Sequence, residues 1–361
     1  MELRPLFADR CSVADALLDI RVARGIDPAI DAVAVNAVER GRFLRASWFE
    51  GALPEGASAQ TMIASRAGQP VIALPIGPGS AGIRAVPGGY WPFRSFPVAA
   101  DATDAEWLAL LRAWKVRSAL GPIWRVGPIY ADDPALSALE RLGPKAGWFV
   151  IRRRIATSFL LDIASQQADG GWPRGSTLRK NRFHEKHLAG HGALDWRFVN
   201  GAGWTEQVFD DLAEIEGRSW HAGSTDTKFL SARHRRQWEA MARDPEQAAG
   251  MWAAMLYIDG QPAAFSFDID SGSVKYAIAN SYDPAFAKHS PGKCLYYRNL
   301  VEAMARGVST VDWGAGDSGY KSTIGAEAGP QIVDCLVVRG RWLGGLGARV
   351  LAPLWARTGQ A

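Results

Sequence analysis

Two separate stretches of the chain are rich in apolar residues, and both contain the tripeptide Gly-Gln-Pro. Residues 61–76 read TMIASRAGQPVIALPI, and residues 252–269 read WAAMLYIDGQPAAFSFDI. In each stretch an apolar run precedes the tripeptide and another follows it, which is typical of two β-strands joined by a tight turn. The sequence therefore predicts two β-hairpins, one turning at Gly68 and the other at Gly260.

The two predicted hairpins begin a longer pattern that recurs 192 residues further along the chain. Tyr90 and Pro92 match Tyr282 and Pro284 at this same offset. A helical pattern and a short strand candidate then follow in each copy, so the pattern indicates a duplicated unit of hairpin, helix and strand. The helices are predicted at 103–114 and 292–307, and the strands after them at 122–129 and 309–316.

The order of these elements places the chain in the mixed α/β class. Antiparallel strands lead into a helix and a further strand, whereas a doubly wound nucleotide-binding fold would alternate strand and helix from the start. Gly314, Gly316 and Gly319 have the spacing of a dinucleotide fingerprint, but that motif should open a long helix between two strands. We therefore predict α/β mixed sheets in two tandem domains, residues 1–155 and 156–361, without a Rossmann site.

Composition favours a soluble protein of a reducing compartment. The length of 361 residues suits two domains, and 48% apolar residues are enough for real cores. Cys11, Cys294 and Cys335 are scattered, which argues against a disulfide framework and a structural zinc. The N-terminus lacks the apolar region of a signal peptide, and no apolar run is long enough to span a bilayer. We expect a cytoplasmic protein.

Positive charge is concentrated in one segment. The net charge is +4, and residues 174–191 alone carry this whole excess, while IRRRI at 151–155 adds a second basic cluster. Residues 176–189 predict a helix capped by Ser176 or Thr177. The basic face could meet the phosphates of a nucleotide sugar, a lipid-linked diphosphate sugar or tRNA, or be a solvated face between domains. Its basic residues at helical spacing are Arg179, Arg182 and Lys186.

The same segment does not predict a metal site. His184-Glu185-Lys186-His187 differs from the zinc motif HExxH, because the second histidine comes one residue early. We expect no metal.

The second copy of the repeat differs from the first at the start of its helix. It has Ser290-Pro291-Gly292-Lys293 there, whereas the first copy has FPVAADATDAEW without a glycine. A glycine at a helix start lets backbone N–H groups approach a pyrophosphate, whose charge the helix dipole favours. An ordinary Pro-Gly turn is the alternative. The second copy also has Tyr320-Lys321 behind the glycine-rich run WGAGDSG, which we expect to swing the chain sharply past the strand end.

These residues resemble the C-terminal half of the GNAT-type acyltransferases of the FemAB and CelD/BcsL-like group. In that group a Tyr-Asp stretch precedes a Pro-Gly helix entry, a later strand ends in Asp, and a Tyr-Lys or Phe-Lys pair follows. GRFLRASWFEGAL at 41–53 and RSWH at 218–221 are similar as well. The resemblance covers most of residues 40–340 and is strongest over 253–338. The matching positions are Tyr282, Asp283, Pro291, Gly292, Asp312, Tyr320 and Lys321.

The resemblance implies two tandem GNAT-like domains, a degenerate first one and a second one with the working cleft. It implies an acyl-CoA donor, such as acetyl-CoA, or an aminoacyl-tRNA. The usual donor loop, Arg/Gln-x-x-Gly-x-Gly/Ala, is reduced here to His289-Ser290-Pro291-Gly292. The matching lysine of FemAB relatives is implicated in stabilising the oxyanion, which assigns that role to Lys321. Asp312 would orient an amine or accept its proton, with Tyr320 beside them. The alternative is a structural ion pair between Asp312 and Lys321.

Several further side chains are candidates for substrate contact. Trp204, Trp220, Trp238 and Trp252 lie in apolar periodic runs, which favours core positions. Within the resemblance, however, Trp220 belongs to the candidate acceptor site. We expect the substrate-binding residues to be Arg179, Arg182, Trp220, Tyr282 and Trp313, and the donor to be held by Ser290, Pro291, Gly292 and Lys293.

The leading functional hypothesis is an N-acyltransferase acting on an amino sugar, free or lipid-linked, in envelope or exopolysaccharide biosynthesis. An aminoacyl-tRNA-dependent transferase is the alternative enzyme, and a non-catalytic component of a polysaccharide-synthesis complex is the third hypothesis. The basic amphipathic tail 340–359 could lie on the inner face of the membrane, but packing on its own domain is favoured.

Overall fold

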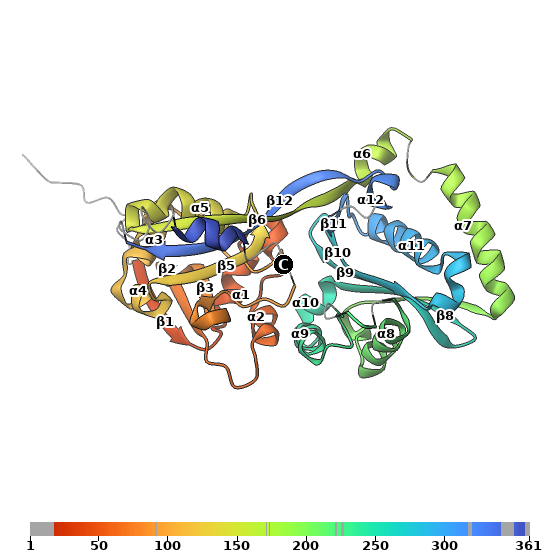
Figure 1. Ribbon diagram of the computed structural model, residues 1–361, viewed down its shortest axis with the longest axis horizontal. Helices are drawn as coiled ribbons and strands as arrows, with labels where there is room; N and C mark the ends of the chain where they lie inside the picture. Colours follow the sequence, from red (N-terminus) through yellow and green to blue (C-terminus); the bar gives the residue numbers. More distant parts are fainter. Residues whose placement is uncertain are drawn as a thin grey trace, which may run out of the picture.

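The structure is a computed structural model that describes residues 18–90, 92–170, 172, 174–220, 222–224, 227–316, 320–340 and 350–357. Its strands form one twelve-stranded mixed sheet in the order β1-β2-β3-β4-β5-β12-β6-β11-β10-β9-β8-β7. Figure 1 shows that this sheet runs through two lobes, with the N-terminal elements in one lobe and the elements from α6 to β11 in the other. The mixed α/β class is therefore confirmed.

The first lobe contains the elements up to the middle of β6. The strands are β1 (Leu18–Arg24), β2 (Gln60–Arg66), β3 (Gln69–Pro78), β4 (Arg84–Ala85), β5 (Ile123–Tyr130) and β6 (Trp148–Asp162). The helices are α1 (Ala29–Val35), α2 (Ala46–Ala52), α3 (Asp104–Arg112), α4 (Trp114–Leu120) and α5 (Pro134–Leu142).

The second lobe contains the remaining elements, among them the basic helix α7. The helices are α6 (Ile163–Ala168), α7 (Gly175–Leu188), α8 (Glu206–Arg218), α9 (Ala232–Ala242), α10 (Pro245–Gly250), α11 (Pro291–Ala305) and α12 (Tyr320–Thr323). The strands are β7 (Leu194–Val199), β8 (Met251–Ile258), β9 (Gln261–Ser271), β10 (Val274–Tyr282), β11 (Thr310–Ala315) and β12 (Glu327–Arg339). None of the described helices is long and apolar enough to cross a membrane.

Both predicted hairpins are present and have the same turn. Ala67 and Gly68 have φ values of 49° and 81°, and Asp259 and Gly260 have φ values of 49° and 75°. Two successive left-handed residues are what a two-residue hairpin loop requires. The register also shifts at equivalent places, between Ala64 and Ser65 and between Leu256 and Tyr257. The structure therefore confirms the duplication at an offset of 192 residues, including the register shift in each hairpin.

The two lobes exchange their last strands. The first half of β6 pairs with the C-terminal half of β12, which itself lies next to β5. The second half of β6 lies next to β11, and there the N-terminal end of β12 forms the outer strand. Figure 1 shows both long strands running between the lobes. The predicted domain boundary at residue 155 therefore falls inside a strand that serves both lobes.

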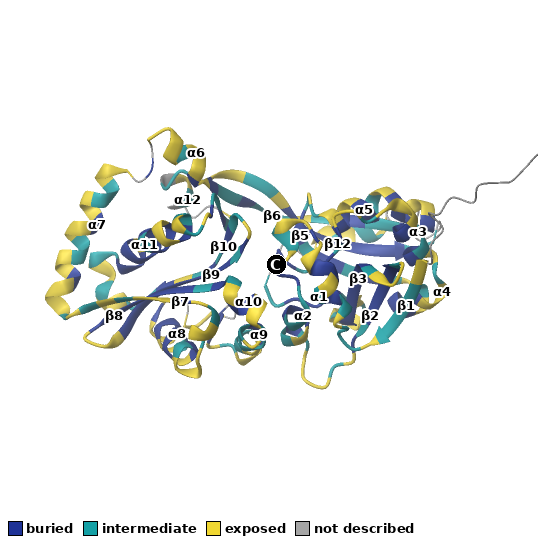
Figure 2. Ribbon diagram, turned by 180° about the vertical axis from the view of Figure 1, so that it is seen from behind, coloured by how far each residue is buried: buried dark blue, intermediate teal, exposed yellow. Residues whose placement is uncertain are grey.

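The lobes also share a hydrophobic core. One cluster of buried side chains contains Trp48 and Phe93 of the first lobe together with Trp238 and Tyr276 of the second. Helices α2 and α9 approach so closely that a Cβ on Gly51 would lie 2.6 Å from the Cα of Gln237. Figure 2 shows buried strands in both lobes, and the shared core joins the two copies into one folded unit.

The basic helix and the tail differ in part from the sequence prediction. Helix α7 begins at Gly175 with Arg174 as its N-cap, so the predicted caps Ser176 and Thr177 lie inside its first turn. Residues 350–357 form a helix whose Trp355 donates a hydrogen bond to the Asp334 carbonyl at 3.2 Å. Packing of the tail is thus confirmed for these residues. The rest of the tail, 341–349 and 358–361, and Cys11 lie outside the described residues.

Candidate active site

The central feature of the second lobe is a gap between two parallel strands. Strands β10 and β11 pair only from Val274–Thr310 to Tyr276–Asp312, and their described residues make no further ladder pair beyond this point. A cavity of about 600 Å³ opens there. One wall is the second half of β10, and the other contains Trp313 and Ala315 of β11. The β10 residues that line it are Ala277, Ile278, Ala279, Asn280 and Tyr282.

The first lobe contributes to this cavity as well. Tyr90 lines it, and the Lys228 ammonium lies 5.1 Å from the centre of the Tyr90 ring. Lys228 belongs to a loop that is fixed by the buried Glu216. The Glu216 carboxylate accepts hydrogen bonds of 2.7–2.9 Å from the backbone N–H groups of residues 228–230. Tyr90 and Tyr282 are equivalent in the repeat, so both copies supply a tyrosine to one cavity.

Trp220 lies at the entrance of the same cavity, where its side chain is 72% exposed. The prediction that all four tryptophans pack in the core is therefore wrong for Trp220, while Trp238 is buried as expected. The helical periodicity misleads here because α8 ends at Arg218, two residues before Trp220. Its expected role in binding a substrate stays a prediction.

The start of α11 forms the rim of the cavity next to β10. Ser290 is the N-cap in a left-handed conformation with φ 48°, and Pro291 is the first helical residue. Gly292 and Lys293 line the cavity. A Cβ on Gly292 would lie 3.1 Å from Asn280 Oδ1 and 3.2 Å from Tyr282 Cδ1, so glycine permits the helix to begin this close to the strand. The four predicted donor-binding residues thus form one helix entry beside the cavity.

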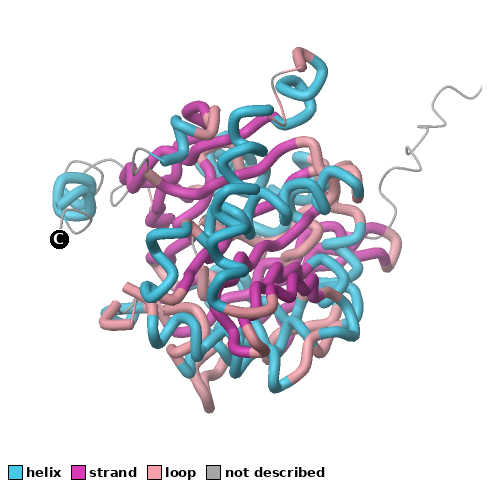
Figure 3. The backbone as a smooth tube through the Cα atoms, turned by 90° about the vertical axis from the view of Figure 1, so that its right-hand side faces the viewer, coloured by secondary structure: helices cyan, strands magenta, loops and turns pink. Residues whose placement is uncertain are grey.

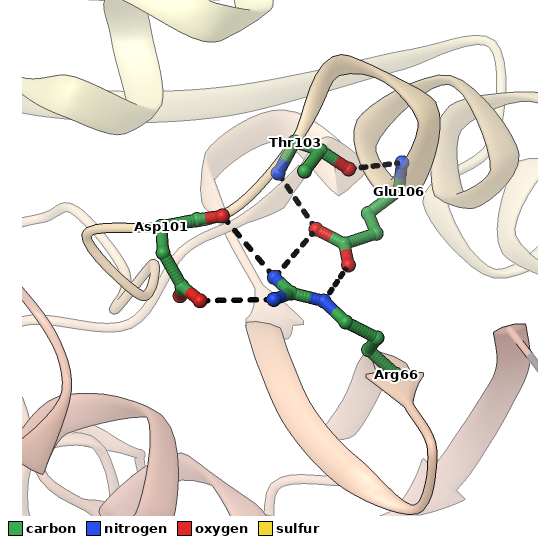
Figure 4. Close-up of polar contacts among 4 residues, drawn as sticks. All are labelled: Arg66, Asp101, Thr103 and Glu106. Atoms are coloured by element: carbon green, nitrogen blue, oxygen red, sulfur yellow. Dashed lines mark hydrogen bonds and ion pairs between the residues drawn. The ribbon is translucent and has the colours of Figure 1, made fainter. Parts of the chain in front are cut away.

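The equivalent helix of the first lobe has a closed N-terminus. Thr103 caps α3, and the Glu106 carboxylate returns to accept a hydrogen bond of 2.7 Å from the Thr103 N–H. Arg66 donates to Glu106 at 2.5 Å and to Asp101 at 2.9 Å (Figure 4). A carboxylate therefore already occupies the place where an anion would bind. In α11 the N-cap Ser290 makes no capping hydrogen bond with its side chain, and Lys293 adds a positive charge.

In the first lobe, the corresponding gap between parallel strands is filled. Strands β4 and β5 pair at Arg84–Trp124 and Ala85–Arg125. The chain then returns so that Phe93 bridges to Ile129, and the buried Phe93 ring packs against the rings of Phe43, Trp48, Tyr130 and Tyr276. Only about 120 Å³ remains beside it. The second lobe alone keeps an open cavity of this kind among the described residues.

Asp312 is buried behind the gap and is 2% exposed. Its carboxylate accepts hydrogen bonds from Tyr130 Oη at 2.7 Å, from Ser158 Oγ and from the Gly314 N–H at 2.8 Å. Burial and the Asp312 charge raise the pKa of Tyr130 well above its usual range. Tyr130 belongs to the first lobe, so Asp312 joins the two lobes where β11 leaves β10.

Lys321 holds the end of β11. Its ammonium donates to the Gly314 carbonyl at 3.0 Å and to the Ala315 carbonyl at 2.9 Å, and Ala315 lines the cavity. Gly314 and Gly316 have φ values of 67° and 68°, as expected for glycines that turn the chain past the strand end. The side chain of Tyr320 lies outside the described residues.

The predicted arginines on α7 do not face this cavity. Arg179 and Arg182 are exposed. On the opposite side of the helix, Arg174 and Lys180 line a second cavity. Sequence analysis missed Tyr90, Ser266, Asn280 and Tyr296 as residues of the main cavity. For Tyr90 the repeat offset was an available signal, whereas the others are adjacent only through the packing of α11 on the sheet.

Comparison with known proteins identifies the class. Residues 175–322 match the family model described as an acetyltransferase (GNAT) domain. The splayed parallel strands with a helix entry beside them are therefore part of a GNAT-type fold, and the chain carries two tandem GNAT-like domains. No curated protein sequence matches the chain. Within the described residues, no group of three or more His, Cys, Asp or Glu side chains could hold a metal ion.

Solved structures show the same fold at low identity. FemX superposes with a TM-score of 0.60 at 13% identity, over 90% of this chain and 99% of that chain. The C-terminal domain of a putative lysylphosphatidylglycerol synthetase from Agrobacterium fabrum has a TM-score of 0.52 at 15% identity, with 90% and 93% covered. L-PGS from Bacillus licheniformis has a TM-score of 0.51 at 12% identity, with 94% and 99% covered. The fold and the domain match support acyl transfer as the class of reaction.

Proposed function

We propose that this protein is an N-acyltransferase that uses an acyl-CoA-type donor, with the acyl end of the donor in the cavity between β10 and β11. One observation carries the proposal: this gap is open in the second lobe, while Phe93 fills its counterpart in the first. An open gap leaves one backbone edge of residues 277–282 available for hydrogen bonds to a linear, amide-containing donor.

The charges around the cavity suit such a donor. The N-terminus of α11 carries a partial positive charge, to which Lys293 adds a full one. A diphosphate group would bind at this helix entry, where Ser290, Pro291 and Gly292 bring the backbone close to β10. The acetyl-CoA class of donor therefore fits better here than at α3, whose N-terminus already holds Glu106.

The acceptor amine would enter between Tyr90 and Trp220, which both line the cavity. Aromatic faces bind the apolar faces of sugar rings, which favours an amino sugar. In the reaction the amine nitrogen attacks the thioester carbonyl, the C–N bond forms and the C–S bond breaks. The proton that the amine loses passes to the departing thiolate, so no other reactant is required.

Lys321 and Asp312 would support this step in different ways. Lys321 would stabilise the charge that develops on the carbonyl oxygen, because its ammonium lies at the end of β11 next to Ala315. Asp312 is hydrogen-bonded on both oxygens and would set the separation of the strands through Tyr130 and Ser158. It would act as a positioning residue.

An aminoacyl-tRNA-dependent transferase remains the alternative because of one surface. Arg179, Arg182 and Lys186 are exposed, and Figure 2 shows that much of α7 is exposed. A row of cations of this kind can bind a nucleic-acid backbone.

The two enzymes are separated by an assay of thiol release. Purified protein with acetyl-CoA and a panel of amino sugars, free and nucleotide-linked, should release free CoA in proportion to acylated product. Transfer from aminoacyl-tRNA, without thiol release from any acyl-CoA, would contradict the proposal and support the alternative. If neither donor reacts or shifts the melting temperature, the non-catalytic hypothesis is favoured.

A further inference from the structure

A second cavity, which the proposed reaction does not use, lies between α7 and α11. Its volume is about 480 Å³. Figure 3 looks at the molecule from the α7 side and shows helices in front of the strands there. Helix α7 is tied to α11 by the ion pair of Glu185 with Arg298 at 2.9 Å. Lys293 and Tyr296 line both this cavity and the one between β10 and β11, so the two cavities meet at these residues.

Buried polar groups in this cavity have no protein partner. Asn181 and Tyr297 are each only 7% exposed. Their Nδ2 and Oη atoms, and the Nδ1 atom of His184, make no hydrogen bond within the described part of the chain. All three residues line the cavity. Leaving buried donors and acceptors unpaired costs stability, so a polar ligand that pairs with these three groups would stabilise the protein.

The walls of the cavity are aromatic and its rim is basic. Trp172 stacks on Tyr297 with ring centroids 5.3 Å apart and planes at 26°. Lys180 and Lys293 line the cavity and are exposed. Burial and the neighbouring Lys293 lower the pKa of His184, which favours the neutral imidazole as a hydrogen-bonding group. Aromatic faces, amide and hydroxyl donors and exposed cations together suit a flat heterocycle that carries phosphate.

We propose that this second cavity binds a nucleoside phosphate, with the base against the aromatic side chains that line it and the phosphate at Lys180 and Lys293. The inference rests on the proposed function in one respect: the nucleotide would be part of a substrate whose reactive end reaches the main cavity past Lys293 and Tyr296. Two sources share this chemistry, the nucleotide half of an acyl-CoA and a nucleotide-activated sugar.

Titration calorimetry with nucleotides alone tests the site without turnover. The probes are 3′,5′-ADP for the first source and UDP for the second, each titrated into the full-length protein. Saturable binding of either one supports the site and identifies its source. If neither binds, the inference is overturned, whereas thiol release in the separate assay still decides the proposed function.

Matched variants locate the binding. Lys180→Ala should lower the affinity for the nucleotide about tenfold, which is the effect of losing one charge-assisted hydrogen bond. Lys186→Ala removes the same charge from the outward side of the same helix and should leave the affinity unchanged. Equal losses in both variants would show general attraction by a basic helix and would overturn the site.

Tyr297→Phe keeps the stacked ring and removes only the unpaired hydroxyl. We expect it to weaken nucleotide binding several-fold while the melting temperature stays the same or rises, because a buried group without a partner is lost. A lowered melting temperature with unchanged affinity would mean that the hydroxyl serves the fold alone, and would contradict the proposal.

Discussion

At the residue scale, Asp312 and Lys321 have different surroundings although the sequence analysis assigns both to one catalytic site. Asp312 is buried and binds Tyr130, Ser158 and the Gly314 N–H. Lys321 is half-buried and binds two carbonyls of the same turn. Both therefore act on residues 314–315, one through an N–H group and the other through carbonyl groups. The roles proposed for the two side chains can therefore be tested separately.

Lys321→Ala tests the role in charge stabilisation. If the ammonium stabilises the oxyanion, kcat should fall by about 10² to 10³ while the melting temperature changes little. Lys321→Arg should restore only part of the rate, because a planar guanidinium does not fit the place of a compact ammonium. Normal turnover with a lowered melting temperature would leave Lys321 with the structural role alone.

Asp312→Asn is the companion variant. It should lower the melting temperature, because the amide turns a donor toward the hydroxyls of Tyr130 or Ser158 inside a buried site. The double variant with Lys321→Ala should be measured in the same melting experiment. Losses that fail to add would show that the two side chains are coupled through the β11 turn, and full stability of Asp312→Asn would refute the positioning role.

Glu106 links stability to pH in the first lobe. Burial by itself would raise the pKa of this carboxyl, but the Arg66 hydrogen bond and the capping bond to Thr103 outweigh burial and hold the pKa below its ordinary value. The ion pair therefore stabilises the fold above the unfolded pKa of about 4.5, and this contribution is lost as the pH falls through the lower folded value.

Glu106→Gln keeps the helix cap and removes the charge. We expect roughly 1 kcal/mol less free energy of unfolding at pH 7, because Arg66 is partly exposed and the pair is screened. The difference from wild type should shrink below pH 4. Chemical denaturation at several pH values measures it, and a difference that does not depend on pH would exclude the ion pair as its cause.

At the element scale, the two copies use the same strands and helices for different purposes. In the first copy, β4 and β5 diverge around Phe93, and the start of α3 is closed by Glu106. In the second, β10 and β11 diverge around a cavity lined by the small side chains of Ala277 and Ala279. The topology alone therefore does not make a binding site, since side-chain size at the gap determines whether it is open.

Ala279→Phe should convert the second gap into a filled one. A benzyl side chain at this position would enter the cavity from the β10 wall, as Phe93 fills the gap of the first lobe. We expect acyl transfer to fall at least 100-fold through loss of donor binding, with a melting temperature close to wild type. Ala315→Phe, from the opposite wall, should have the same effect, and full activity in both variants would place the donor elsewhere.

At the scale of the whole molecule, the exchange of β6 and β12 makes the two lobes depend on each other. β12 separates β5 from β6 in the first lobe and is the outer strand beside β6 in the second. Side chains of both lobes share one core. Neither lobe is therefore a complete folding unit when the chain is divided at residue 155.

A chain that ends at Gly325 tests this dependence. Without β12, the edge of β5 and one edge of β6 would be exposed, and unpaired edges promote aggregation. We expect loss of the cooperative melting transition of both lobes, followed by circular dichroism, and association in sedimentation experiments. A truncated chain that melts cooperatively near the wild-type temperature would show that the lobes fold independently.

The local elements of this protein are determined by the sequence itself. The hairpins at Gly68 and Gly260, the helix starting at Pro291 and the strand after it depend on neighbouring residues, so turn chemistry and periodicity predict them. The expectation that Asp312 closes this strand is wrong, because β11 continues to Ala315. The duplication is visible in sequence because both copies keep the same turn, and the resemblance to GNAT-type acyltransferases rests on such short-range patterns as well.

The tertiary structure alone decided which residues meet. Tyr130 and Asp312 are 182 positions apart, and Arg125 and Asp334 are 209 apart, so no local pattern connects them. The exchange of β6 and β12, the open cavity beside Ala279 and the second cavity under α7 all depend on such contacts. Free-energy differences between alternative packings of the same elements select these features. Such differences depend on contacts across the complete chain and not on neighbouring residues alone.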